Sequence, residues 1–147
     1  MRTAHTLAIT FALLVAGSNA FAADSTSQVI KRQAPKGITA SFYACVDKAG
    51  SDTTAQGTCL TAEKKAQDTR LNTTYKALTA KLTGKAKDNL LASQRAWLEF
   101  RNKNGDFEAT LYGDEPVADL QVTQNDIFRL AERADALDKY LTIANDQ

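Results

Sequence analysis

The sequence contains little histidine, cysteine or proline. Its 147 residues include one histidine, two cysteines, two prolines and seven glycines. The histidine, His5, lies in an N-terminal segment that we expect to be removed. Without it, the mature chain has no residue for a Ser-His-Asp or Cys-His catalytic arrangement or for a histidine-based metal site. We therefore expect no catalytic residues, no cofactor and no metal, and we take binding as the default function. The scarcity of proline and glycine favours long helices over a β-fold with many turns.

The first 22 residues have the pattern of a secretory signal peptide. Arg2 supplies a positive charge, Leu7–Ala16 is a ten-residue apolar run, and Ala20-Phe21-Ala22 is a small-x-small cleavage pattern. The run is far shorter than the ~20 residues that a membrane-spanning helix needs. We expect cleavage after Ala22, no membrane span after cleavage, and a periplasmic or secreted mature protein.

Loss of this segment leaves the chain without net charge. Removal of Arg2 lowers the number of Lys and Arg residues from 18 to 17, against 17 Asp and Glu residues. A neutral chain has no global field to attract nucleic acid or an anionic membrane, so we expect no nucleic-acid partner.

The two cysteines, Cys45 and Cys59, both lie in the mature chain. An exported protein meets an oxidising compartment, which predicts a disulfide between them. A bridge that closes a loop of this length stabilises the folded protein by about 3 kcal/mol in the chain-entropy model. A redox-active pair is the alternative, but such pairs usually have CxxC spacing, and thirteen residues separate these two.

The remaining pattern predicts an all-α fold, a small antiparallel helical bundle with one disulfide. We expect a flexible tail over residues 23–40 and a helical domain over 41–147, with a short helix at 41–48 and a loop at 49–58. Three long helices follow, over about residues 60–82, 85–109 and 117–143. The Thr83-Gly84 pair is expected to end the first of them.

Apolar spacing supports all three long helices. The first has a stripe at i, i+4, i+7 and i+11, made of Leu71, Tyr75, Leu78 and Leu82. The second has a stripe with polar members, made of Leu90 or Leu91, Gln94, Trp97, Leu98, Arg101 and Phe107. The third has a heptad seam along its whole length, made of Leu120, Thr123, Ile127, Leu130, Ala134, Leu137 and Leu141.

Two short segments, residues 68–75 and 94–101, place polar side chains at positions that should face inward on their helices. If the first two long helices are antiparallel neighbours, Asp68 could form a buried ion pair with Arg101 or Arg95, which would fix the helix register. We favour a structural network over a binding site for this set, which consists of Asp68, Asn72, Tyr75, Gln94, Trp97 and Arg101.

These segments resemble the lysozyme inhibitor LprI-like N-terminal domain family of exported bacterial proteins. The family pattern is a D-x-x-L-N-x-x-Y helix, a Q-R-x-W-x-x-[YF]-R helix and a late R-x-x-x-L. The matching residues are Asp68, Leu71, Asn72, Tyr75, Gln94, Arg95, Trp97, Phe100, Arg101, Arg133 and Leu137. The resemblance covers about residues 42–141 and implies a small helical exported protein. Some relatives are associated with inhibition of lysozyme-type peptidoglycan hydrolases.

The chain departs from that family in one respect. Members commonly carry a second cysteine pair, but here Gly105 stands near the first of these positions and no cysteine follows Cys59. The Leu111–Asp119 segment therefore lacks the second bridge.

An acidic segment over residues 104–119 contains no lysine or arginine. Together with its aromatic residues it is a candidate surface for a cationic partner, such as a lysozyme or another cell-envelope protein, although an ordinary solvated loop would have similar composition. The candidate binding residues are Asp106, Phe107, Glu108, Tyr112, Asp114 and Glu115.

Three functions stay open at this point. The first is inhibition of a cell-wall hydrolase by occlusion of its cleft. The second is a structural or envelope-stress module that inhibits nothing. The third is a weak enzyme that uses carboxylates alone, although no spacing singles out a catalytic pair.

Overall fold

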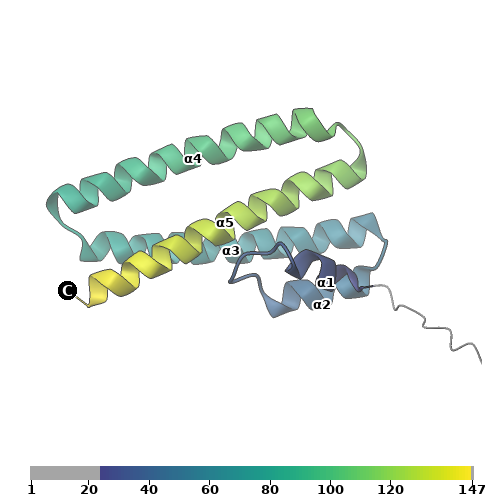
Figure 1. Ribbon diagram of the computed structural model, residues 1–147, viewed down its shortest axis with the longest axis horizontal. Helices are drawn as coiled ribbons and strands as arrows, with labels where there is room; N and C mark the ends of the chain where they lie inside the picture. Colours follow the sequence, from purple (N-terminus) through teal and green to yellow (C-terminus); the bar gives the residue numbers. More distant parts are fainter. Residues whose placement is uncertain (1–23, 147) are drawn as a thin grey trace, which may run out of the picture.

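The computed structural model describes residues 24–146 and is built from helices (Figure 1). The predicted signal peptide and its cleavage site lie outside the described residues. The elements are α1 (Thr26–Lys31), α2 (Ala40–Ala49), α3 (Thr53–Lys81), α4 (Gly84–Tyr112) and α5 (Pro116–Asn145). No strand occurs in residues 24–146, which confirms the all-α prediction.

The long helices begin and end where local chemistry directs them. The side chain of Asp52 accepts a hydrogen bond from the backbone N–H of Ala55 and caps α3, which therefore starts earlier than predicted. Gly84 has φ +53° in the predicted turn between α3 and α4, and Gly113 has φ +79° at the end of α4. Pro116 begins α5. The connection between α4 and α5 is thus shorter than the predicted helix ranges of 85–109 and 117–143 imply, because α4 continues to Tyr112.

Part of the predicted flexible tail is helical. Ser25 and Gln28 form a capping box at the start of α1. Ser27 is buried, and its N–H and hydroxyl both donate to Asp47 of α2, at 2.8 and 2.6 Å. The sequence did not reveal how this helix attaches to α2, because its anchor is a long-range polar contact.

The predicted disulfide between Cys45 and Cys59 is confirmed. It joins α2 to the first half of α3, with the two Cα atoms 5.7 Å apart. Phe42 and Val46 of α2 and Leu60 of α3 are buried beside it. The bridge therefore closes the end of the bundle that carries α1 and α2 (Figure 1).

The main interface of the bundle joins α3 to α5. Consecutive long helices are antiparallel, so α3 and α5 run in the same direction (Figure 1). The heptad seam of α5 lies in this interface, and its central members Ile127, Leu130, Ala134 and Leu137 are fully buried. Leu130, Ala134 and Leu137 pack with Leu71 and Leu78 of α3, and Ile127 packs in the neighbouring cluster with Leu60. These contacts confirm the predicted core faces of both helices.

Helix α4 is much less buried than α3 and α5. It packs on α5 but makes few close backbone approaches to α3. Leu90 and Gln94 are its only buried residues within the described chain. The predicted inward stripe is wrong for Leu98 and Phe107, which are 42% and 60% exposed, because α3 makes few close approaches to α4 and α5 covers a different face of it.

Candidate functional site

The six residues of the predicted polar network meet around one groove. The groove lies between α3 and α4 and has a volume of about 230 Å³. Asp68, Asn72, Tyr75, Gln94, Trp97 and Arg101 all border it. The six residues that the sequence pattern groups therefore do lie close together in the structure. They line an open groove, however, and do not form a closed core between α3 and α4.

The ion pair predicted for Asp68 does not form. Arg101 donates from Nε and Nη2 to the two carboxylate oxygens of Asp126 on α5, at 2.6 and 2.8 Å. Lys64 of α3 approaches the same carboxylate at 2.9 Å. Asp68 is exposed and accepts from Asn72 on its own helix at 3.2 Å. The prediction failed because α5 supplies a better-placed carboxylate than α3.

These contacts shift the pKa values of both partners. Burial alone would raise the pKa of Asp126, but hydrogen bonds from Arg101 and Lys64 outweigh it and hold that pKa below its ordinary value. Hydrogen bonding from Arg101 to Asp126 raises the pKa of Arg101. Both groups remain charged near neutral pH, so the pair joins α4 to α5 across that range.

Gln94 and Trp97 connect the same two helices. Gln94 accepts a hydrogen bond from Nε of Arg133 at 2.9 Å. The Trp97 ring lies 5.8 Å from the guanidinium carbon of Arg101 and 5.9 Å from that of Arg133. Burial lowers the pKa of Arg133. The three residues Gln94, Trp97 and Arg101 thus attach α4 to α5, whereas the predicted network joined the first two long helices.

Glu108 is not exposed, contrary to the prediction that it belongs to a binding surface. Arg129 of α5 donates to both oxygens of Glu108, at 2.7 and 2.9 Å. The two side chains are only 13% and 14% exposed. Glu108 faces α5 because it lies seven residues, about two helical turns, beyond Arg101 on α4. Glu108 therefore contributes to the α4–α5 interface and is not a candidate binding residue.

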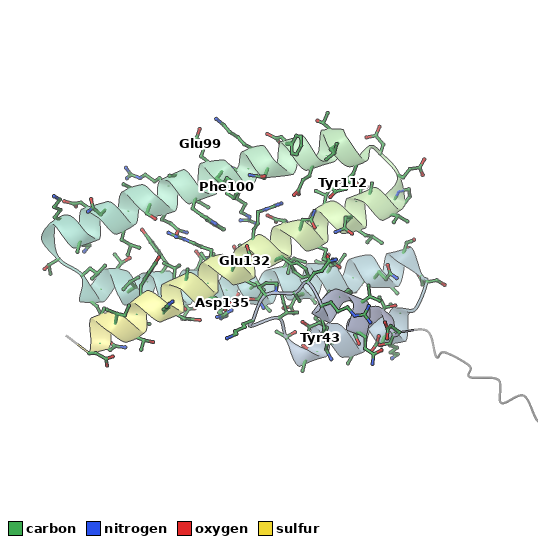
Figure 2. The ribbon with its side chains drawn as sticks, in the orientation of Figure 1. Tyr43, Glu99, Phe100, Tyr112, Glu132 and Asp135 are labelled. Carbon is green, nitrogen blue, oxygen red and sulfur yellow. A yellow bond between two sulfur atoms is a disulfide. The ribbon has the colours of Figure 1, made fainter. Side chains whose placement is uncertain are left out.

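The other candidate residues are exposed where α4 turns into α5. Phe107 is 60% exposed and Tyr112 is 45% exposed, and Figure 2 shows Tyr112 close to the turn. Leu111 and Val117 are 63% and 66% exposed at the same end. We call this surface the hairpin tip and define it as Asp106, Phe107, Leu111, Tyr112, Asp114, Glu115, Val117 and Asp119.

A model of the family described as lysozyme inhibitor LprI matches residues 45–137. The chain belongs to the lysozyme inhibitor LprI family. The matched range includes the disulfide, the groove and the hairpin tip. No curated protein and no solved structure matches the chain.

A second polar network of this LprI-family chain was missed in the sequence. Glu63 is 3% exposed and accepts from the Thr39 N–H at 3.0 Å, from the Thr39 hydroxyl at 2.5 Å and from Gln67 at 2.7 Å. Arg70 forms ion pairs with Asp135, at 2.5 Å, and with Asp138, both on α5. The i, i+4, i+7 spacing of Glu63, Gln67 and Arg70 was the available signal.

The carboxylates between the helices are engaged by neighbouring donors. Glu63 is engaged by three hydrogen-bond donors, and Asp126 and Glu108 are occupied by arginines. Within residues 24–146 no group of three or more His, Cys, Asp or Glu side chains is placed to hold a metal ion. In the same residues, no helix has both the length and the apolar character needed to cross a membrane.

Proposed function

We propose that this protein is an exported, non-enzymatic inhibitor of a lysozyme-type peptidoglycan hydrolase. It acts by occlusion, with the hairpin tip placed against the cleft of the hydrolase. Membership of the lysozyme inhibitor LprI family supports the class of partner. The N-terminal Leu7–Ala16 run followed by Ala20-Phe21-Ala22 supports export.

The observation that carries this proposal is the exposure of large apolar side chains at one end of the α4–α5 hairpin. Phe107, Leu111 and Val117 are each at least 60% exposed, and Tyr112 is close to half exposed. Exposed apolar groups that gather at one place on a soluble protein commonly mark an interaction surface. Aromatic side chains are the residues that most often anchor protein interfaces.

The charge of the hairpin tip fits a cationic partner. Asp106, Asp114, Glu115 and Asp119 are exposed, and residues 104–119 contain no lysine or arginine. Many lysozymes are cationic, so this surface would attract them and orient the encounter. Glu108 adds little to this field because Arg129 neutralises it.

The hairpin tip is held in place before any partner arrives. The pairs Arg101–Asp126 and Arg129–Glu108 join α4 to α5 in the half of the hairpin that leads to the tip. Binding then costs less conformational entropy than it would for a mobile loop. These pairs hold α4 against α5 in a chain that has no cysteines for a second disulfide.

An inhibition assay with the purified mature protein tests the proposal. Muramidase activity of a panel of lysozymes should fall in proportion to the added protein at micromolar concentrations. Charge reversal with Asp114→Lys and Glu115→Lys should weaken inhibition, whereas Asp88→Lys at the far end of α4 should not. Binding to envelope proteins with no loss of muramidase activity would instead favour a structural interaction module.

A further inference from the structure

The end of the bundle opposite the hairpin tip is rich in lysine. There the end of α3, the start of α4 and the last turns of α5 come together (Figure 1). Residues 81–89 and 139–146 hold four lysines against two acids, Asp88 and Asp146. All four lysines are exposed, and none forms an ion pair within residues 24–146. We call this surface the basic end and define it as Lys81, Leu82, Lys85, Lys87, Lys139, Tyr140 and Ile143.

The basic end also exposes apolar side chains. Tyr140 and Ile143 are 49% and 51% exposed on the last turns of α5. Both border an open pocket of about 320 Å³, and Leu82 and Leu90 line the same pocket from α3 and α4. Large apolar side chains that are exposed around a hollow commonly mark an interaction surface. The basic end is therefore a second candidate interface, besides the hairpin tip.

The hairpin tip and the basic end are complementary in charge and in exposed apolar surface. The tip has four exposed acidic residues, and residues 104–119 contain no lysine or arginine. The most exposed apolar side chains of the tip are Leu111 and Val117, at 63% and 66%. An acidic surface with exposed apolar side chains matches a lysine-bordered apolar pocket, because opposite charges attract and the apolar groups leave water together.

The two surfaces cannot meet within one molecule. Helix α4 runs from the basic end to the hairpin tip through 29 residues, a helix about 43 Å long. Each surface can therefore contact only the complementary surface of another molecule. Because the two surfaces differ, such a contact is head-to-tail and leaves one tip and one basic end free for further copies.

We propose that the hairpin tip of one copy of this chain binds the basic end of a second copy. The acidic residues of the tip face the lysines of the basic end. Leu111 and Val117 lie against Tyr140 and Ile143 at the pocket. A tip bound in this way is withheld from a hydrolase. That consequence rests on the proposed function, whereas the association itself does not.

Sedimentation of the mature protein over a range of concentrations tests the association. The average mass should rise with protein concentration at low salt. The association constant should fall about tenfold or more between about 0.05 M and about 0.5 M salt, because salt screens the charges of the two surfaces. A mass that stays at that of one molecule up to about 1 mM protein would overturn the proposal.

Two charge-reversed variants make the test specific to these surfaces. One carries Asp114→Lys and Glu115→Lys at the tip, and the other carries Lys81→Glu and Lys85→Glu at the basic end. Each variant alone should associate at least about tenfold more weakly than the wild type. An equimolar mixture should associate again, since it combines an intact tip with an intact basic end. This recovery would also show that both variants are folded.

A matched control changes the net charge equally at other places. Lys48→Glu with Lys65→Glu alters two exposed lysines on α2 and α3 and should leave the association unchanged. A mixture that stays monomeric, or a control that associates as weakly as the Lys81→Glu, Lys85→Glu variant, would overturn the proposal. Association without any inhibition of muramidase activity would refute the proposed function alone.

Discussion

Arg101 of α4 donates two hydrogen bonds to the carboxylate of Asp126 on α5, at 2.6 and 2.8 Å. Both side chains are less than one-fifth exposed. The pair lies about midway along the hairpin, at the edge of the groove that Arg101 borders. The pair therefore helps to hold α4, the least buried of the long helices, against α5.

Loss of this pair should destabilise the fold. Asp126→Ala removes the partner of a largely buried guanidinium, and we expect a loss of about 2 kcal/mol in the free energy of unfolding. Asp68→Ala, at an exposed site, should change it by less than about 0.5 kcal/mol. Urea unfolding followed by circular dichroism measures both. Equal effects of the two variants would show that Asp126 is not the critical partner.

The same pair should make the stability of the fold depend on pH in the acidic range. Because the folded-state pKa of Asp126 lies below its ordinary value, the stabilisation is fully present above the unfolded-state pKa of about 3.9 and is lost as the pH falls through the folded value. The stability difference between wild type and Asp126→Asn should therefore be constant from pH 7 to about pH 5 and shrink below about pH 4. A difference that grows towards low pH would contradict this assignment.

Reduction of the disulfide should loosen one end of the bundle. The Cys45–Cys59 bridge closes a short loop, so its removal should cost about 3 kcal/mol. We expect hydrogen exchange to accelerate first in α1 and α2, because the bridge is the covalent link between α2 and α3. Uniform acceleration along α3, α4 and α5 would show instead that the bridge stabilises the whole bundle equally.

Gly37 should be hard to replace. It has φ +87°, and an added Cβ would lie 2.1 Å from Nη1 of Arg70, which Asp135 holds in place. Gly50 also has a positive φ, but nothing lies within 4 Å of its Cβ position. Gly37→Ala should therefore cost about 1–3 kcal/mol more than Gly50→Ala in thermal or urea unfolding. Equal costs would mean that Arg70 moves aside freely.

The core could be predicted from the sequence because spacing alone decides which residues share a helix face. The seam that contains Ile127, Leu130 and Leu137 is the clearest example, and all three are 0% exposed. Spacing does not reveal which neighbour covers a face. Leu98 and Phe107 continue the stripe of α4 and are exposed, because α3 stays away from that part of the helix.

Polar partners were harder to predict than the core. The sequence indicates that Arg101 needs a carboxylate but does not choose between Asp68 and Asp126, since the choice depends on how three helices cross. Glu108 was assigned to the surface for a similar reason, because its partner Arg129 lies on another helix. Helical spacing could have revealed Glu63, Gln67 and Arg70, which repeat the i, i+4, i+7 pattern on a second face of α3.

The most direct measurement of the central claim compares two phenylalanines of α4 in a lysozyme inhibition assay. Phe107 and Phe100 are 60% and 54% exposed and lie two helical turns apart, but only Phe107 belongs to the hairpin tip. We predict that Phe107→Ser weakens inhibition by about tenfold or more, as for an interface anchor, and that Phe100→Ser leaves it unchanged. Equal inhibition by both variants and the wild type, or no inhibition by the wild type, would contradict the account.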